Sequence, residues 1–405
     1  MSNTPKLRFK EFSEDWEVNK IASVFDRVIN KVDVIEEEYY EQIGIRSHGK
    51  GIFYKEPVTG KELGNKRVFW VEPNVFVVNI VFAWEQAVAR TTKNEVGMIA
   101  SHRFPMYKPK ENILDLDYIT QLFKTPKGKF LLGLASPGGA GRNKTLGQKE
   151  FEDLDIVLPS YEEQKKISSF ISLIDKKIGK QSEKVEALKD YKNGMMQKIF
   201  SRELRFKDEE GRYYPEWEEK KVGECVDIFL GLTYTPTYVE KGVPFLSVKD
   251  ISNRNDICFD NIKYISEEEY KNATSNAKPK KGDILFGRVG TLGNPIIIKE
   301  DIDICIFVSL GFLRVKNNNI INSFIAQWMK SDLFLKQVDK KIAGSSQKNL
   351  NTGWLKDFNI KIPAKNEQIK IYELLNQIDI KISKEQDKLD SLNEYKKGLL
   401  QQMFV

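Results

Sequence analysis

The feature that most constrains this chain is an internal duplication. The segment from Pro159 to Phe200 aligns without a gap on the segment from Pro363 to Phe404, a shift of 204 positions (363 − 159), and 17 of the 42 aligned pairs are identical. A short run directly after the first copy, Leu204 to Lys207, repeats Leu7 to Lys10 letter for letter. Solenoid repeats recur every 20 to 50 residues or so. A period of half the chain therefore indicates a duplicated module, in which a variable globular block is followed by a matching helix, twice.

Composition describes a globular chain of several domains. Its 405 residues, 40% hydrophobic and 30% charged, leave room for two to three domains with separate cores. The longest apolar run, Val75 to Trp84, is interrupted by Asn79 and falls short of the roughly 20 residues of a membrane span. It predicts a buried strand. The first residues contain no apolar stretch, which predicts no secretory signal. Cys225, Cys258 and Cys305 are odd in number and far apart, so neither a disulfide framework nor a metal knuckle is expected. We expect a cytoplasmic protein.

The charge balance permits a polyanionic partner without requiring one. The chain has 64 basic and 58 acidic residues, a formal charge of +6, and an isoelectric point near 8.8. Domains that bind DNA through a basic face usually have an isoelectric point above 9. Clustering of the basic residues on one face would still allow nucleic-acid binding.

The duplicated segment has the pattern of a long, paired helix. Ser160 to Glu163 forms a capping-box pattern, and apolar residues then recur at alternating spacings of four and three for more than four heptads. The apolar stripe residues are Ile167, Ile171, Ile174, Ile178, Val185 and Leu188 in the first copy, and Ile371, Leu375, Ile378, Ile382, Leu389 and Leu392 in the second. Both copies have polar residues at the same two stripe positions, Gln181/Glu385 and Lys192/Lys396, and polar layers fix register at a cost in stability.

Two interpretations of this stripe are open. Each helix packs on its own globular block, or the two helices pack on each other, which a narrow stripe favours. A pseudo-twofold axis makes such a pair antiparallel. Forty residues at 1.5 Å each give a rod of roughly 60 Å. We therefore expect the paired helices to act as a rigid spacer that holds two heads apart.

The two globular blocks, here called heads, share a frame and differ elsewhere. Trp16 and Trp217 stand at equivalent entries, and core anchoring is more common for such residues than ligand contact. Short β-like runs follow, at Tyr39 to Ile45, Val68 to Val71, Val75 to Phe82, Pro244 to Val248, Asp283 to Phe286 and Ile296 to Ile298. One helix-like segment comes next in each head, Asp117 to Leu134 and Ile320 to Val338, and then a closing strand, Leu154 to Leu158 and Phe358 to Ile362. Divergent heads on matched helices indicate two different ligands of one general kind.

The loop before each closing strand is the main candidate for a nucleic-acid contact. It carries Arg142, Asn143 and Lys144 in the first head and Ser345, Ser346, Gln347, Lys348 and Asn349 in the second. These side chains contact phosphates and read base edges in the major groove. A solvated loop that closes the domain is the alternative. Further candidates are Arg46, His48 and Arg103 in the first head and Lys249 and Arg288 in the second; for each, an ordinary surface charge is an equal alternative.

The sequence predicts no catalytic site. Gly138 to Thr145 approaches a phosphate-binding P-loop, but Asn143 stands where glycine is required before the lysine. The two histidines, His48 and His102, form no HExxH pattern, and no nucleophile elbow surrounds any serine. Asn294-Pro295-Ile296 begins like an amino-methyltransferase motif but lacks its aromatic end.

Over nearly its whole length the chain resembles the specificity subunits of type I restriction–modification systems. The resemblance is carried by the Pro…Glu-Gln starts of both helices, their Tyr-Lys-x-Gly-x-x-Gln endings and the Trp-Glu entries to both heads. Gly344 to Leu350 and Gly282 to Phe286 also resemble segments of this family's target recognition domains. In the first head, Arg142 to Thr145 departs from the Gly-Ser-x-Gln sequence that is usual in this family.

The resemblance implies an α+β fold with two target recognition domains of mixed α/β type and twisted, mostly antiparallel strands. Two long helices that form an antiparallel coiled coil separate these domains. The expected division is a first recognition domain at residues 1–158, a first spacer helix at 159–203, a second recognition domain at 204–362 and a second spacer helix at 363–405. It implies a non-catalytic subunit that reads a bipartite double-stranded DNA target, one head per half-site. Two methylation subunits carrying S-adenosylmethionine and two restriction subunits using ATP and Mg²⁺ are the implied partners, with no cofactor on this chain.

Geometry and energetics agree with this implication. Half-sites read from one face of DNA lie about 34–36 Å apart, which a rod of about 60 Å can span. Affinity would come chiefly from phosphate neutralisation and depend steeply on salt. The alternatives are a coiled-coil assembly scaffold whose heads bind proteins, and a self-sufficient nuclease or methyltransferase. The salt dependence of binding and turnover by the purified chain distinguish them.

Overall fold

The chain forms two compact units; unit 1 contains both ends of the sequence, and unit 2 is the continuous segment between them. The computed structural model describes residues 4–138, 144–251, 256–289, 292–343 and 349–404. Unit 1 consists of residues 1–181 and 388–405, and unit 2 of residues 182–387. Each unit therefore holds one head, part of the first long helix and part of the second. Among the described residues, no helix is long and apolar enough to cross a membrane.

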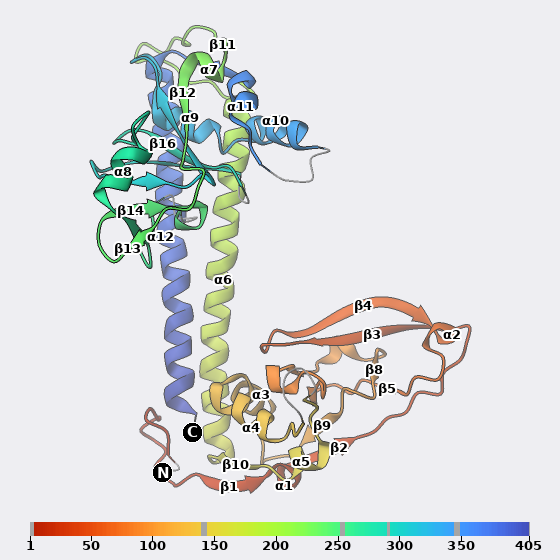
Figure 1. The fold of residues 1–405 in the computed structure, drawn as a ribbon. Coiled ribbons are helices and arrows are strands. Elements are labelled where there is room, and N and C mark those ends of the chain that lie inside the picture. Colours follow the sequence, from red (N-terminus) through yellow and green to blue (C-terminus); the bar gives the residue numbers. More distant parts are fainter. Residues whose placement is uncertain (1–3, 139–143, 252–255, 290–291, 344–348, 405) are drawn as a thin grey trace. The chain divides into compact units, whose positions relative to one another are not determined.

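The head of unit 1 is built from short strands and short helices (Figure 1). Its strands are β1 (Glu17–Lys20), β2 (Phe25–Val28), β3 (Tyr39–Arg46), β4 (Gly51–Thr59), β5 (Val68–Trp70), β6 (Phe76–Val78), β7 (Val88–Arg90), β8 (Ile99–Ser101), β9 (Met106–Pro109) and β10 (Asp155–Leu158). Its helices are α1 (Ile21–Val24), α2 (Gly60–Leu63), η1 (Ala83–Glu85), η2 (Lys93–Glu95), α3 (Leu116–Lys124), α4 (Pro126–Leu134) and α5 (Gln148–Glu152). The first long helix, α6 (Tyr161–Phe200), follows.

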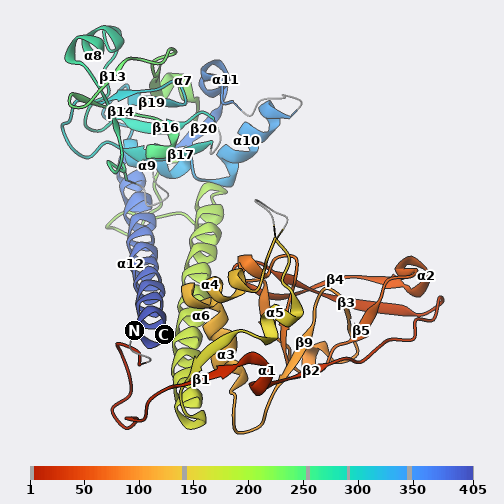
Figure 2. The same cartoon turned by 60° about the horizontal axis from the view of Figure 1, so that its bottom comes forward.

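The head of unit 2 has a similar order of elements (Figure 2). Its strands are β11 (Glu218–Lys221), β12 (Val226–Leu230), β13 (Tyr238–Val239), β14 (Val243–Leu246), β15 (Lys263–Ile265), β16 (Ile284–Gly287), β17 (Gly293–Ile297), β18 (Cys305–Ile306), β19 (Leu310–Val315) and β20 (Asn359–Ile362). Its helices are α7 (Val222–Cys225), η3 (Val248–Asp250), α8 (Glu267–Ala273), α9 (Asn322–Trp328), α10 (Asp332–Ile342) and α11 (Thr352–Asp357). The second long helix is α12 (Lys365–Met403).

The two heads share part of their sheet topology. One four-stranded sheet has the order β2-β9-β6-β7 in unit 1 and β12-β19-β16-β17 in unit 2. The second four-stranded sheet of each head differs, with the order β4-β3-β8-β5 in unit 1 and β13-β15-β14-β18 in unit 2. The first strand of each head pairs with its closing strand, β1 with β10 and β11 with β20, and both pairs are antiparallel. The described strand pairings are antiparallel apart from β3–β8 and β14–β18. The expected mixed α/β architecture with mostly antiparallel strands is confirmed.

Each helix-like segment predicted in the heads is in fact two helices. In unit 1, Thr125 ends α3 and caps α4, its side chain accepting a hydrogen bond from the Gly128 backbone N–H, with Pro126 at the first helical position. Proline is favoured there because the missing N–H has no partner in a helix. In unit 2, Ser331 caps α10 in the same way. The expected strand from Val75 to Phe82 is also shorter, because the chain leaves β6 at Val78 and turns into η1.

Within each unit the two long helices lie side by side and run in opposite directions. In unit 1 the start of α6, with Ile167 and Ile171, shares one apolar cluster with Leu399 and Met403 near the end of α12 and with the head core. In unit 2 the end of α6, with Met196 and Ile199, shares a cluster with Ile371 and Leu375 at the start of α12. Of the twelve apolar stripe residues, seven are buried, and Ile178, Leu188, Ile382, Leu389 and Leu392 are half-buried. Both interpretations of the stripe therefore hold, because each helix packs on a head and on the other helix.

One of the two polar stripe positions, Lys192/Lys396, carries matched ion pairs. In unit 2 the Lys192 ammonium of α6 lies 2.7 Å from the Asp379 carboxylate of α12. In unit 1 the Lys396 ammonium of α12 lies 2.6 Å from the Asp175 carboxylate of α6. Both partners of one pair are related to those of the other by the 204-residue shift. These charges hold the register of the helices in each unit.

The repeated Leu-Arg-Phe-Lys run has a structural role that the sequence did not disclose. Arg8 donates two hydrogen bonds of 2.8 Å to the buried Glu163 carboxylate near the start of α6. Arg205 donates to the buried Glu367 carboxylate near the start of α12, at 3.1 and 3.4 Å. The entry tryptophans, Trp16 and Trp217, are buried, as predicted.

The glutamine after each of these glutamates fastens the head to the helix. The Gln164 amide donates to the Ile113 and Pro159 carbonyls and its oxygen accepts from the Asp115 N–H. Gln368 makes the same three contacts with Asn319, Pro363 and Ile321. The Pro…Glu-Gln pattern therefore specifies the joint between helix and head.

Candidate nucleic-acid interface

In unit 1 the tip of the β3–β4 hairpin presents basic side chains at a fixed place. Arg46, His48 and Lys50 are exposed around this tip, and His48 has a left-handed backbone (φ 61) that suits a tight turn. The His48 and Gly49 N–H groups donate to the Glu85 and Gln86 carbonyls at the end of η1. The Gln86 amide in turn donates to the Phe123 and Thr125 carbonyls. Predicted contacts Arg46 and His48 thus lie on a hairpin tip held by the turn between β6 and β7.

Two other candidates of the first head, Arg103 and Lys144, lie on segments that bond to the beginning of the same turn, at Ile80. The Ile80 N–H donates to the Arg103 carbonyl, and the Ile80 carbonyl accepts from the Leu146 N–H, two residues after Lys144. Arg103 is exposed and Lys144 is half-buried. Arg142 and Asn143 lie outside the described residues. Arg46, His48, Arg103 and Lys144 are thus gathered around residues 79–87.

This turn adds a residue that sequence reasoning missed. Phe82 belongs to this turn and is 43% exposed. An exposed aromatic ring beside basic side chains can contact a base face or a thymine methyl group. Phe82 was missed because it belongs to the apolar run from Val75 to Trp84, and such a run predicts a buried strand rather than an exposed turn.

In unit 2 the predicted contact Arg288 lies inside the fold. Its guanidinium is buried and donates to the Val308 and Leu350 carbonyls, at 2.9 and 3.2 Å. Burial lowers the pKa of this guanidinium below its usual range. These contacts favour a role in holding the backbone around residues 307–310 and 350.

The remaining described candidates of unit 2 surround Arg288. The Ser309 carbonyl accepts from the Arg288 N–H, and the Ser309 hydroxyl accepts from the Val248 N–H, which precedes the exposed Lys249. The exposed Asn349 pairs with Val289 in an isolated antiparallel bridge. Lys249 and Asn349 thus belong to segments that are linked by hydrogen bonds or pairing to Ser309 and Val289, next to Arg288. Ser345, Ser346, Gln347 and Lys348 lie outside the described residues, and all these DNA contacts stay predictions.

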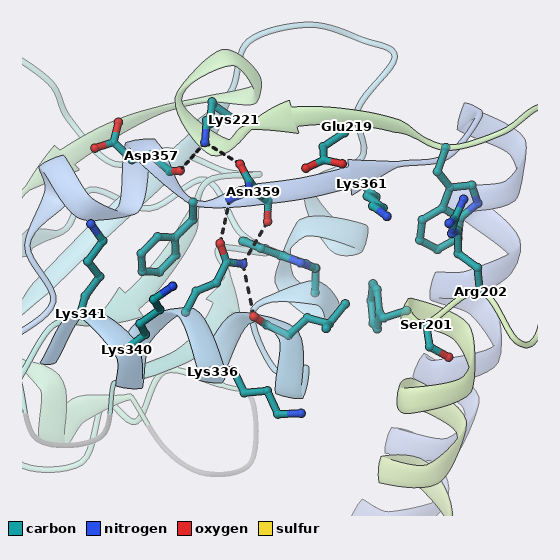
Figure 3. A pocket seen from close by; sticks show the side chains of 16 residues that line it. Ser201, Arg202, Glu219, Lys221, Lys336, Lys340, Lys341, Asp357, Asn359 and Lys361 are labelled. Atoms are coloured by element: carbon teal, nitrogen blue, oxygen red, sulfur yellow. Dashed lines mark hydrogen bonds between the residues drawn. The ribbon is translucent and has the colours of Figure 1, made fainter. Parts of the chain in front are cut away.

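A second feature of unit 2 is a basic groove between α10 and the β11–β20 pair (Figure 3). The groove has a volume of about 830 Å³. Its charged lining residues are Arg202, Lys221, Lys336, Lys340, Lys341 and Lys361, with Glu219 and Asp357 as the carboxylates. Sequence reasoning missed this groove, although the spacing of Lys336 and Lys340 places them one turn apart on one helix face.

Within the described ranges, no group of three or more His, Cys, Asp or Glu side chains could hold a metal ion. Cys225 and Cys305 are buried and unbridged. Burial raises the pKa of the Cys305 thiol to about 11, so this thiol is not an activated nucleophile.

The fold defines a duplicated protein with two α/β heads and two long helices that pair in opposite directions. The family model described as type I restriction modification DNA specificity domain matches twice, at residues 13–189 and 214–394. The chain is 28% identical to the type I restriction enzyme MjaVIII specificity subunit of Methanocaldococcus jannaschii, over 96% of this chain and 91% of that protein. Its fold matches the type I restriction-modification S subunit from M. genitalium with a TM-score of 0.59 and 16% identity, over 99% of each chain. It matches a chain from a structure of type I complex assembly equally well, with a TM-score of 0.59 and 17% identity, over 97% of this chain and 98% of that one.

The chain belongs to the type I restriction-modification DNA specificity family. It is a DNA-specificity subunit, and the resemblance drawn from the sequence is confirmed. Members of this family supply recognition, so the expected non-catalytic role is confirmed by membership. The scaffold and self-sufficient enzyme alternatives are set aside.

Proposed function

We propose that the two heads read the two halves of a bipartite double-stranded DNA sequence and that the paired helices fix the distance between the halves. The observation that carries this proposal is the combination of one shared frame with two different surfaces. Both heads have one four-stranded sheet of the same strand order and the same Arg–Glu and Gln anchors. Their exposed loops carry different side chains. A single module mounted twice suits two half-sites, and unlike loops suit unlike half-sequences.

We further propose that two copies of a methylation subunit bind this chain. The support is a duplicated, exposed motif that packing within the chain does not explain. Tyr191 and Tyr395 are 56% and 55% exposed at equivalent positions. Gly194 and Gly398 follow at identical spacing, and a Cβ at either would meet no described atom within 4 Å.

Glycine inside a helix costs roughly 0.5–1 kcal/mol relative to alanine. Two glycines retained at the same place without an internal contact favour close approach by a partner. Because the motif occurs twice, two identical partners fit it. These would be the methylation subunits with S-adenosylmethionine, and two restriction subunits would join the full assembly in the cytoplasm.

The boundaries of the four functional segments are part of the proposal. Residues 1–158 and 204–362 would be the recognition domains, and residues 159–203 and 363–405 the spacer helices. The helices α6 and α12 begin and end within these spacers. The joints at Gln164 and Gln368 support a division at the start of each helix.

The decisive experiment maps modified adenines across a genome in which this chain is co-expressed with its methylation subunit. We expect one bipartite motif with an unspecified spacer. Replacing residues 1–150 by another head should change one half of that motif only. A chimera that changes both halves, or neither, contradicts the assignment of one head to each half-site.

A further inference from the structure

We propose that the basic groove of unit 2 binds the sugar-phosphate backbone of duplex DNA through Lys336, Lys340 and Lys361, three lysines that the first head lacks at the corresponding positions. This inference rests on the proposed function, because it names a backbone contact for a DNA-reading head. The groove lies apart from the cluster around Arg288 in sequence and is lined by the end of α6, by β11 and β20, and by α10.

The first argument is an excess of positive charge without internal neutralisation. Six cationic side chains and two carboxylates line the groove. Arg202 is paired with Glu216, and Lys221 donates to the Asp357 carbonyl and the Asn359 side chain. In the part of the chain that the structure describes, Lys336, Lys340 and Lys361 form no ion pair. Like charges one turn apart destabilise a helix by a few tenths of a kcal/mol, so this arrangement favours a bound polyanion.

The second argument is that the groove is held open by contacts that do not use the free lysines. The Gln337 amide donates to the Asn359 carbonyl at 3.0 Å, and the Asn359 N–H donates to the Gln337 oxygen at 2.8 Å. Phe334 and Val338 are buried on the opposite face of α10. The helix is thereby fixed to β20, and Lys336 and Lys340 are exposed; Figure 3 shows both side chains on α10.

The chemistry fits a phosphate track better than base reading. Lysine is a compact point charge that neutralises phosphate without selecting a base. Lys336 and Lys340 are separated by about 6 Å along the helix axis, close to two nucleotide steps of about 3.4 Å along one strand. The groove also precedes, in the sequence, the loop at residues 344–350 that is predicted to read bases. A backbone contact beside a reading loop would set the orientation of the head on DNA.

The third argument is the contrast with the first head. Counted from the capping residues Thr125 and Ser331, the fifth and ninth positions are Phe130 and Leu134 in α4 but Lys336 and Lys340 in α10. The third residue of the closing strand is Val157 in β10 but Lys361 in β20. Three apolar residues thus stand where the second head has three lysines.

The test is the triple variant Lys336→Ala, Lys340→Ala and Lys361→Ala in the full chain, assembled with its methylation subunits. Affinity for duplex DNA is measured against salt concentration, on target and non-target sequences. Each phosphate contact contributes about 0.9 to the slope of log affinity against log salt. We expect the slope to fall by up to about 2.7, with the same proportional loss on both sequences. The methylated motif should stay unchanged.

The matched control is Lys241→Ala, Lys271→Ala and Lys281→Ala, which removes the same charge from exposed positions of unit 2. It should leave the slope near that of the wild type. A Lys-to-Arg triple at the groove positions should restore the slope, because it restores the charge.

Three results would overturn the inference. One is an unchanged slope, and another is a loss confined to the target sequence, which assigns base reading to the groove. The third is loss of subunit assembly with DNA binding by the free chain intact, which assigns the groove to an acidic protein partner. If the wild-type complex itself prefers no sequence, the proposed function fails instead, so the two failures are distinguishable.

Discussion

The two heads are alike where they join the helices and unlike where they face solvent. Both have one four-stranded sheet of the same order, the same antiparallel pairing of first and closing strands and the same buried Arg–Glu pair. By contrast, the first head presents the β3–β4 hairpin tip around Phe82, and the second presents a lysine-lined groove. The residues that are repeated between the two halves therefore attach each head to the helices. The residues that differ between the halves form the surface with which each head recognises its target.

Even the shared frame is not identical in its details. The Trp217 indole N–H donates to the Glu367 carboxylate at 3.0 Å. The equivalent Trp16 N–H is buried and has no described partner. Both oxygens of Glu163 instead accept short bonds from Arg8. The same glutamate thus has one strong donor in unit 1 and several shared donors in unit 2.

The largest effect is expected from breaking the buried Arg–Glu pairs. Arg8→Ala leaves the fully buried Glu163 carboxylate without its guanidinium, and loss of one partner of a buried pair costs about 3–5 kcal/mol. Arg205→Ala should cost about 1 kcal/mol less, because Glu367 keeps the Trp217 and Phe206 N–H donors. Hydrogen–deuterium exchange at the starts of α6 and α12 measures each joint separately.

The control for this pair is Arg202→Ala, which removes an exposed ion pair with Glu216 and should cost under about 1 kcal/mol. Equal protection losses for Arg8→Ala and Arg205→Ala would show that the Trp217 bond contributes nothing. In that case Trp217→Phe should also leave exchange at the start of α12 unchanged.

A smaller effect is expected from the ion pairs between the helices. Lys192 and Asp379 have side chains 10% and 18% exposed, whereas Lys396 and Asp175 are 24% and 38% exposed. Asp379→Asn should therefore cost about 2 kcal/mol, and Asp175→Asn about 1 kcal/mol or less. Double-mutant cycles with Lys192→Met and Lys396→Met isolate the two coupling energies. Equal couplings would show that the difference in exposure has no energetic consequence.

The sequence predicted the frame better than the recognition surfaces, for a physical reason. Helix pairing and the buried entry tryptophans follow from local spacing, which a repeated segment displays twice. The break at Thr125 and Ser331 was missed because apolar spacing continues through both residues, and only Pro126 marks one of them. The candidate surfaces depend on bonds between distant segments, such as Ile80 with Arg103 and Leu146. No local pattern encodes such a juxtaposition, and Arg288 accordingly proved to be buried.

The smallest expected effect is a pH dependence of the free energy of unfolding. It arises from one lysine in each head that lies near the ion pair between the helices. Burial and the neighbouring Lys192 lower the pKa of Lys330 to about 8, with Asp379 opposing them. In unit 1, burial and Lys396 lower the pKa of Lys124 in the same way, with Asp175 opposing them. Both units therefore hold a cation in a place that disfavours its charge.

The sign of the resulting pH dependence follows from proton binding. Between about pH 8 and 10.5 the unfolded chain keeps the Lys330 proton that the folded chain has released, so this group makes folding more favourable as the pH rises. The slope is at most about 1.4 kcal/mol per pH unit. Lys330→Met should be more stable than the wild type at pH 7.5, and that advantage should shrink at pH 9.5. Urea unfolding of both proteins at the two pH values measures the difference, with the exposed Lys381→Met as control. An advantage that is the same at both pH values would show that Lys330 does not titrate in this range. The two units would then share the ion pair between their helices but not a neighbouring lysine with a lowered pKa.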